Sequence, residues 1–291
     1  MKLEIQNISK RYSTDKYGLK DFSLTLENGI LGLLGPNGAG KSTLMKMIAT
    51  ISKPTSGTIV LDGVDITKQP DTIRQVLGYL PQDFGVYPNL NGYEFLSYIA
   101  AMKGIGGKNL KQRVAQLLEN VNLTEAAKKP IGTYSGGMKQ RIGIAQVLLN
   151  DPKVLIFDEP TVGLDPEERV RFRNLISELA NDCIIILSSH IVSDIETIAD
   201  EVAIMKNGAL ILKGFQPDIV QTVNGKVFQL EINSSDLSAF KEKYLILNTI
   251  RKKELVQVRF VAKSAVNGAT PCIATLEDAY LYLTKQQNET L

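Results

Sequence analysis

The stretch GPNGAGKST, residues 35–43, constrains the fold more than any other feature of this chain. It matches the P-loop pattern G-x-x-x-x-G-K-[ST]. It also lies between a short apolar run, ILGLLG, and a segment with apolar residues at helical spacing, which is the context that the pattern requires. Glycines let the backbone N–H groups converge on phosphate oxygens at the positive end of a helix dipole. Lys41 would bring a charge to the β- and γ-phosphates, and the Ser42 hydroxyl would be a ligand for Mg²⁺. We therefore expect a nucleoside triphosphate to be bound by Gly35, Pro36, Asn37, Gly38, Ala39, Gly40, Lys41, Ser42 and Thr43.

The order of apolar patterns predicts an α/β fold. Strands alternate with helices on both sides of a helical stretch at about residues 88–150, which favours a mainly parallel sheet with a helical insertion. The segment EVAIMKNGALILKG reads as a hairpin around Asn207-Gly208. We expect residues 1–216 to form the main domain and residues 217–291 to form a small accessory subdomain of strands and helices. The helix TLEDAYLYLTKQ in that subdomain has an apolar face, for which packing on the main domain is the favoured interpretation.

Composition narrows the class of protein without favouring a nucleic-acid partner. With 44% hydrophobic and 22% charged residues and a net charge of +2, the chain has the balance of a globular protein and no basic excess for nucleic acid. We expect no signal peptide at MKLEIQNISK and no transmembrane segment, and hence an intracellular protein. The two cysteines make no disulfide framework, and Cys183 is expected in the core.

The stretch KVLIFDEP carries the next candidate residues. Asp158 follows four apolar residues, so it should emerge at the carboxyl end of a buried strand, where open α/β sheets bind their ligands. An aspartate there suits the Mg²⁺ shell. Glu159 beside it could orient a water for in-line attack and accept its proton. The alternative for Glu159 is a carboxylate at a helix start.

The stretch YSGGMKQR predicts a second anion site. Ser135 is a natural N-cap, so an ordinary capped helix is one interpretation. The N–H groups of a glycine-rich helix start can also bind phosphate. Since a subunit with one P-loop needs no second γ-phosphate site, we expect this site to serve another subunit.

The single histidine, His190, follows the apolar run CIIILSS. Taken alone, a histidine at a strand end is more often a packing residue than a catalytic one.

In the order GPNGAGKST, YSGGMKQR, VLIFDEP, GLDP and SSH, these motifs resemble the nucleotide-binding subunit of an ABC transporter over about residues 1–215. The resemblance implies the P-loop NTPase ABC cassette fold, with an antiparallel β subdomain beside the mainly parallel sheet. It implies two cassettes bound head to tail around two ATP molecules, as a homodimer or heterodimer. The stretch YSGGMKQR corresponds to the signature motif of this family. Its residues Tyr134 and Met138, which flank the serine and glycines, and the form GLDP are similar to those of cassettes that serve separate exporter-type permeases.

The resemblance also implies individual roles. Tyr12 would stack on adenine, although Tyr17 lies near and either could be a packing residue. Gln82 would contact Mg²⁺ together with Ser42 and Asp158, and it would relay the nucleotide state. Lys41, Gln82, Glu159 and His190 would be catalytic, with His190 bound to the γ-phosphate. The contacts made in trans would come from Ser135, Gly136, Gly137 and Asp165.

The partner implied by the resemblance is a membrane permease. The stretch FGVYPNLNGYEFLSY is rich in aromatics, of which we expect Phe95 in the core and Phe84 and Tyr87 on the surface, where a permease helix could dock. The protein would then be an ATPase on the cytoplasmic face of the membrane, peripheral to it, with ATP and Mg²⁺ as its ligands. The alternative is a soluble ABC-type ATPase with a regulatory or nucleic-acid- or ribosome-linked mechanical role and no permease.

Overall fold

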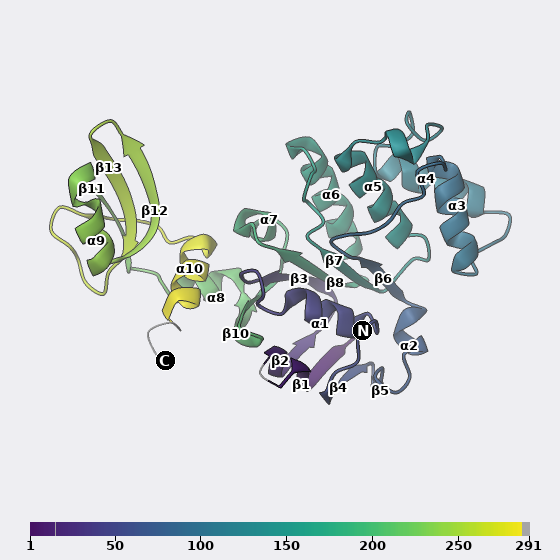
Figure 1. Ribbon diagram of the computed structural model, residues 1–291, viewed down its shortest axis with the longest axis horizontal. Coiled ribbons are helices and arrows are strands. Elements are labelled where there is room, and N and C mark those ends of the chain that lie inside the picture. Colours follow the sequence, from purple (N-terminus) through teal and green to yellow (C-terminus); the bar gives the residue numbers. More distant parts are fainter. Residues whose placement is uncertain (15, 287–291) are drawn as a thin grey trace.

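The computed structural model describes residues 1–14 and 16–286. Figure 1 shows a body built on two sheets, a lobe of helices on one side of the body, and a third, smaller sheet that stands apart on the other side. Within the described residues, no helix combines the length and apolar character needed to cross a bilayer. The predicted α/β architecture is confirmed.

A six-stranded sheet forms the centre of the body, in the order β10-β9-β3-β8-β7-β6. Its strands are β3 (Gly29–Leu34), β6 (Leu77–Leu80), β7 (Val154–Asp158), β8 (Ile184–Ser189), β9 (Glu201–Lys206) and β10 (Ala209–Phe215). All neighbours are parallel except β9 and β10, which form the hairpin predicted at Asn207-Gly208. Because helices and a second sheet cover its two faces, β7 and β8 are buried at every position. The parallel order brings the carboxyl ends of β3, β6, β7 and β8 to one edge.

A second, antiparallel sheet covers one face of the central sheet, in the order β2-β1-β4-β5. Its strands are β1 (Leu3–Ser13), β2 (Lys16–Leu26), β4 (Ser56–Leu61) and β5 (Val64–Asp65). Helix α1 (Lys41–Ile48) lies between the two sheets (Figure 1), and its buried residues share one hydrophobic core with both of them. The N-terminus of α1 is therefore fixed by packing on two sides.

Helices cover the opposite face of the central sheet. They are α6 (Pro166–Leu179), α7 (Val192–Glu196) and the helices of a lobe that we call the helical lobe, α3 (Gly92–Met102), α4 (Leu110–Asn120) and α5 (Gly136–Val147). Helices α3 to α5 lie where the sequence pattern predicted helices. The pattern did not indicate the short elements α2 (Asp71–Arg74), β6 and a 3₁₀ turn at Ile131–Thr133.

The aromatic stretch before and within α3 corrects one expectation. Phe95 is fully buried, as predicted. Phe84 was expected on the surface, but it is half-buried, because Gly143 of α5 leaves room for its ring; a Cβ on Gly143 would lie 2.3 Å from that ring. Tyr87 is 48% exposed and packs edge-on against Tyr98, with ring centroids 5.0 Å apart. Tyr87 and Tyr98 therefore form an exposed aromatic pair on the helical lobe.

The C-terminal subdomain, from β11 to α10, has its own sheet in the order β12-β13-β11-β14. Its elements are β11 (Val227–Asn233), a 3₁₀ turn (Ser234–Asp236), α9 (Leu237–Lys243), β12 (Leu245–Lys252), β13 (Leu255–Val261), β14 (Thr270–Pro271) and α10 (Leu276–Gln286), and α8 (Gln216–Gln221) leads into it. A small separate core around Phe228, Val258 and Phe260 holds the sheet to α9.

Helix α10 joins this subdomain to the body. Leu276 and Ala279 are fully buried in the main core, and α10 contacts α7 and α8. The interpretation of this helix as a packing element is confirmed.

An ion pair ties α10 to the subdomain's sheet. Asp278 of α10 is 3% exposed, and its two carboxylate oxygens accept hydrogen bonds from Arg259 of β13 at 2.9 and 2.5 Å. Burial by itself would raise the pKa of Asp278, but the hydrogen bonds from Arg259 and Thr275 and the Arg259 charge outweigh it, so the pKa lies below its ordinary value.

We expect Asp278→Asn to lower the free energy of unfolding by about 2 kcal/mol. Breaking a fully buried pair costs about 3–5 kcal/mol. We expect a loss of only about 2 kcal/mol, because the Arg259 side chain is 23% exposed. Urea denaturation measures this loss, and Glu242→Gln, at an exposed carboxylate of α9, is the control. Equal stabilities of the two variants would show that the pair does not hold α10.

The pair also gives stability a pH dependence. Since the folded-state pKa of Asp278 is depressed, its contribution is complete above the ordinary value of 3.8 and is lost as the pH falls through the lowered value. Asp278→Asn should remove this part of the acid-induced loss in a pH series of urea midpoints.

Candidate functional site

The loop of residues 35–40 joins β3 to α1 and is packed against two other strands. A Cβ on Gly35 would lie 2.5 Å from the carbonyl oxygen of Met205, and a Cβ on Gly40 would lie 2.5 Å from that of Gly18. Gly40 also has φ of 104°, in the region that favours glycine. Glycine is therefore required at both positions, and the loop exposes its backbone at the N-terminus of α1.

Lys41 begins α1 and is only 7% exposed. Its Nζ donates to the carbonyl oxygens of Gly35 at 2.5 Å and Pro36 at 3.3 Å. Burial lowers the pKa of Lys41, while the charges of Glu159 and Asp158 act in the opposite direction. The ammonium group thus lies inside the loop, within the field of both carboxylates.

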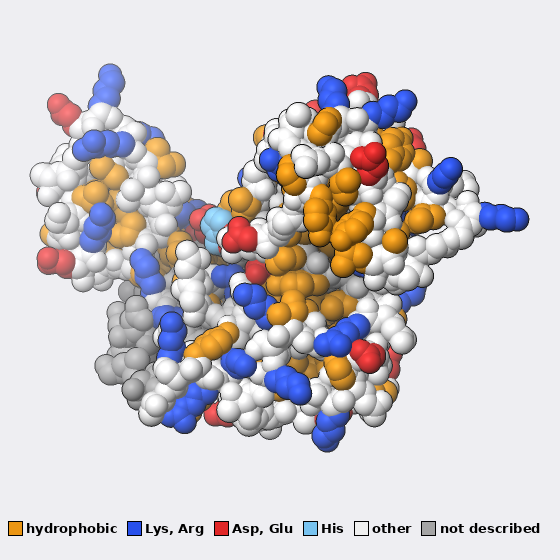
Figure 2. Space-filling view, turned by 45° about the vertical axis from the view of Figure 1, so that its right-hand side comes forward, with side chains coloured by type: hydrophobic (Ala, Val, Ile, Leu, Met, Phe, Trp, Pro, Cys, Tyr) orange, Lys and Arg blue, Asp and Glu red, His pale blue; other side chains and the backbone are white. Residues whose placement is uncertain are grey.

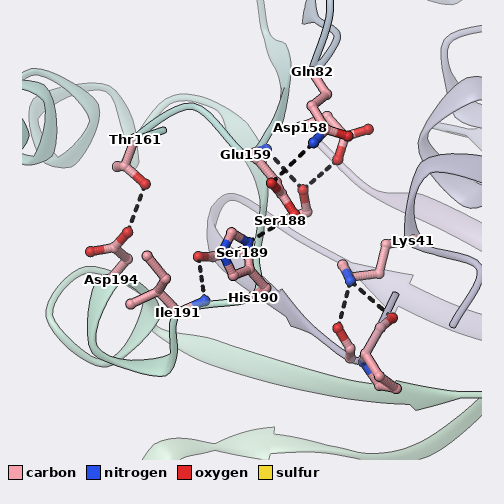
Figure 3. Close-up of polar contacts among 12 residues, drawn as sticks. Lys41, Gln82, Asp158, Glu159, Thr161, Ser188, Ser189, His190, Ile191 and Asp194 are labelled. Atoms are coloured by element: carbon pink, nitrogen blue, oxygen red, sulfur yellow. Dashed lines mark hydrogen bonds and ion pairs between the residues drawn. The ribbon is translucent and has the colours of Figure 1, made fainter. Parts of the chain in front are cut away.

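A buried serine holds the Asp158 carboxylate and the Glu159 backbone at the end of β7 (Figure 3). The Ser188 hydroxyl, at the end of β8 and fully buried, donates to Asp158 Oδ1 at 2.6 Å and accepts from the Glu159 N–H at 3.0 Å. Glu159 has φ of 54°, a conformation that costs a non-glycine residue about 1–3 kcal/mol. The chain therefore turns sharply between Asp158 and Glu159 and directs the two carboxylates differently.

The Glu159 carboxylate is held between two side chains from neighbouring strand ends (Figure 3). Gln82, after β6, donates from Nε2 to Oε2 at 3.2 Å, and Nδ1 of His190, after β8, lies 3.1 Å from Oε1. Because an ionised carboxylate only accepts hydrogen bonds, Nδ1 of His190 carries the proton in this contact. His190 is therefore an exposed polar residue of the site, not a packing residue.

These groups surround a cavity of about 820 Å³. Predicted site residues that line it are Tyr12, Gly35, Pro36, Asn37, Gly38, Ala39, Gly40, Lys41, Ser42, Thr43, Gln82, Glu159 and His190. The remaining lining residues are Lys16, Tyr17, Gly18 and Tyr280. The Tyr12 hydroxyl lies 3.2 Å from Thr43 Oγ1, and the Tyr12 side chain is 56% exposed, so it stands over the end of the loop instead of packing in the core.

The predicted trans residues lie outside this cavity, on a different part of the surface. The Ser135 hydroxyl caps α5, accepting from the Met138 N–H at 3.2 Å. Gly137 is packed so closely against the 163–165 loop that a Cβ would lie 2.9 Å from the carbonyl oxygen of Gly163. Asp165 at the end of that loop caps α6. The α5 terminus and this loop thus form one platform, which we call the signature platform (Ser135, Gly136, Gly137 and Asp165).

The candidate Mg²⁺ ligands are chemically suited to that ion. Ser42, Gln82 and Asp158 offer hydroxyl, amide and carboxylate oxygens, and Mg²⁺ prefers such hard donors in small number together with substrate phosphates. The Asp158 charge acts to raise the pKa of Lys41 at the head of the loop, but Asp158 itself is only 3% exposed and is not among the residues that line the cavity. The described residues contain no cluster of three or more His, Cys, Asp or Glu side chains that could hold a metal without such phosphates.

Sequence reasoning missed two residues that the structure places at the site. Ser188 lies in the SSH motif, but its hydrogen bonds to the Asp158 carboxylate and the Glu159 N–H follow from the pairing of β7 with β8. Tyr280 lies in the C-terminal subdomain, which carries no motif. Only the spatial position of α10 reveals it.

The chain matches known proteins closely enough to show its family. The family model described as "ABC transporter" matches residues 19–162. An uncharacterized ABC transporter ATP-binding protein of Bacillus subtilis, YxlF, is 41% identical over 231 residues, or 79% of this chain and 76% of that protein. The linearmycin resistance ATP-binding protein LnrL of the same organism is 38% identical over 234 residues, or 79% and 75%.

Solved structures agree on the fold. The ATP-binding subunit of an ABC transporter aligns with a TM-score of 0.69 at 30% identity, over 76% of this chain and 93% of that one. A dimeric post-hydrolysis state of the ATP-binding cassette MJ0796 with ADP and Pi aligns with a TM-score of 0.67 at 24% identity, over 73% and 98%. The predicted cassette fold is confirmed.

We expect Ser188→Ala to lower the free energy of unfolding by about 2–3 kcal/mol, since it leaves a buried carboxylate and a backbone N–H without a partner. The matched control is Ser189→Ala, which removes one hydrogen bond, from the Ile191 N–H at 2.9 Å, and should cost about 1 kcal/mol. Thermal or urea unfolding compares them. A Ser188 variant no less stable than the Ser189 variant would contradict the bridging role.

Proposed function

Because this chain belongs to the ABC transporter family as an ATP-binding subunit that hydrolyses ATP to drive transport, we propose that it dimerises head to tail on two ATP molecules and drives a separate exporter-type permease. The observation that carries the proposal is the division of the site. Lys41, Gln82, Glu159 and His190 meet at one cavity, while the signature platform lies outside it. One subunit thus carries two separate parts of an ATP site, one at the cavity and one at the signature platform.

ATP would bind with its phosphates on the loop of residues 35–43. The N–H groups at the start of α1 and the Lys41 ammonium would neutralise phosphate charge. Tyr12, over the end of the loop, would stack on adenine. Ser42, Gln82 and Asp158 would hold Mg²⁺ together with phosphate oxygens, and the ion would supply further neutralisation of the charge that develops in phosphoryl transfer.

Glu159 would act as the general base. Its carboxylate is 11% exposed and held at both oxygens, so it is oriented before the attacking water arrives. A protonated His190 donates from both ring nitrogens, one to Glu159 and the other to the γ-phosphate. Loss of that phosphate would remove the second contact and so report hydrolysis.

The signature platform of a second subunit would close the site. Its capped helix start would bind the γ-phosphate through Ser135, Gly136 and Gly137, and Asp165 would cross the interface. The pairing of two such chains is consistent with the dimer formed by the cassette MJ0796.

The helical lobe would carry the permease contact. Tyr87 and Tyr98 are 48% and 41% exposed, and Figure 2 shows hydrophobic side chains gathered on this lobe above a hollow. An exposed aromatic pair of this kind suits a short helix of a membrane partner.

The protein would sit peripherally at the cytoplasmic face of the membrane, with residues 1–216 as the cassette and 217–291 as the accessory subdomain. The name of LnrL, a resistance protein, favours the exporter type.

We expect Glu159→Gln to lower ATP turnover by about 10²–10⁴-fold while ATP binding persists, so that an ATP-loaded dimer accumulates. Phosphate release measures turnover, and gel filtration with Mg²⁺-ATP measures association. The control is Glu178→Gln, an exposed carboxylate of α6, which should behave as the unmodified protein. A Glu159 variant that stays monomeric with ATP at low salt would overturn the dimer mechanism.

We expect the double variant Tyr87→Ser, Tyr98→Ser to release a co-purifying polytopic membrane protein from detergent-solubilised membranes, with the ATP affinity of the subunit unchanged. Phe84 is left intact because its ring fills the space beside Gly143. Phe215→Ser, at an aromatic that is 57% exposed on β10, is the control. Purification of the unmodified protein alone, or with ribosomes or DNA, would remove the transport function and leave the ATPase.

A further inference from the structure

Tyr280 brings the C-terminal subdomain into the nucleotide cavity. It is a residue of α10, yet it lines the same cavity as residues 35–43, Glu159 and His190. Every other residue that lines this cavity comes from the body.

The position of Tyr280 is fixed from several sides. Leu276 and Ala279, beside it on α10, are fully buried in the main core. Asp278 is paired with Arg259 of the subdomain's sheet. One helical turn beyond Tyr280, the carbonyl oxygen of Thr284 accepts a hydrogen bond from Nζ of Lys206. These contacts leave Tyr280 half-buried and facing the cavity.

The anchor at Lys206 continues directly to the P-loop. Gly208, two residues beyond Lys206, donates its N–H to the carbonyl oxygen of Ala39 at 3.0 Å. A Cβ on Gly208 would lie 3.0 Å from the carbonyl oxygen of Gly18, so the β9–β10 turn is packed tightly between β2 and the loop. Helix α10 is therefore held against the one turn that also supports the nucleotide-binding backbone.

The Tyr280 hydroxyl is chemically suited to a nucleotide oxygen. Burial raises the pKa of Tyr280, so the phenol stays protonated and remains a donor. Among residues 1–14 and 16–286 it has no hydrogen-bond partner, whereas the hydroxyl of Tyr134, a buried core tyrosine, donates to the carbonyl oxygen of Ala126 at 2.9 Å. Since Tyr280 lines the cavity, a protonated hydroxyl on it is complementary to an acceptor-rich ligand such as a nucleotide.

We propose that Tyr280 is a nucleotide-binding residue, which donates its hydroxyl to an oxygen of the ATP bound on residues 35–43. This inference rests on the proposed function, because it requires ATP in that cavity. It makes the C-terminal subdomain part of the ATP site.

Coupling of the two parts follows from this contact. If ATP binds more tightly when α10 is docked, then ATP must in turn stabilise the docked α10 by the same factor. Helix α10 also contacts α7, which follows His190, and the Leu276 N–H lies 3.4 Å from a carboxylate oxygen of Glu196 in α7. Nucleotide binding would thus affect the subdomain through Tyr280, on a helix that also contacts α7, the helix after His190.

The test is Tyr280→Phe, which keeps the ring and removes only the hydroxyl. We expect the affinity for Mg²⁺-ATP to fall about three- to tenfold, the size of one hydrogen bond, in titration calorimetry with the full chain. The matched control is Tyr282→Phe on the same helix, whose ring lies under Lys226, 5.4 Å from the ammonium, outside the cavity. The control should bind ATP as the unmodified protein does.

A second readout separates nucleotide contact from simple packing. In the unmodified protein, ATP should slow hydrogen exchange of the α10 amides, and Tyr280→Phe should reduce this ATP-dependent protection without changing the protection seen in the absence of nucleotide. Unchanged affinity and unchanged ATP-dependent protection in Tyr280→Phe would overturn the inference. Lys41→Ala distinguishes the two proposals: if it leaves ATP affinity intact, the proposed function itself fails, and if it abolishes binding while Tyr280→Phe has no effect, only the Tyr280 inference fails.

Discussion

Close backbone packing around residues 35–40 is the constraint on which the rest of the structure depends. A side chain at residue 35 would collide with β9, and one at residue 40 would collide with β2, so the loop that presents N–H groups to phosphate is locked between both sheets. The β9–β10 turn fills the remaining space, with Gly208 bonded to Ala39. Such a loop needs little reorganisation when an anion arrives, which is what makes preorganised N–H groups effective.

A second constraint is the backbone at Glu159. A glycine would adopt this positive φ without conformational strain, but it has no carboxylate. A glutamate at this position is therefore strained, at a cost in folding free energy of about 1–3 kcal/mol. The Ser188 hydroxyl holds the strained N–H, while Gln82 and His190 hold the carboxylate. The strain lies at Glu159, whose N–H bonds to Ser188 at the strand end and whose side chain lines the cavity.

The sequence predicts those parts of the site whose residues are neighbours along the chain or lie at strand ends. Residues 35–43, Asp158 and Glu159 follow apolar runs, and because parallel strands end at one edge, the sequence pattern already places them together. Contacts between distant segments escape such reasoning. The burial of Phe84 depends on the missing side chain at Gly143, and the place of Tyr280 depends on how a subdomain without motifs docks. Neither follows from hydrophobic periodicity, which describes one element at a time.

In the proposed function, the separation of the cavity from the signature platform gives a physical reason for dimerisation. A ligand shifts a conformational equilibrium only by the difference in its affinity for the two states. In the proposed function, ATP would meet the same loop, the same Glu159 and the same His190 of one subunit whether or not a second chain is near. The difference would then come from groups that reach ATP only on closure, and we propose the capped start of α5 as such a group, because it lies outside the cavity of its own subunit. The start of α5 would contact mainly the γ-phosphate. In the proposed cycle, closure of the dimer therefore depends on the phosphate that hydrolysis removes, and loss of that phosphate would reopen the dimer.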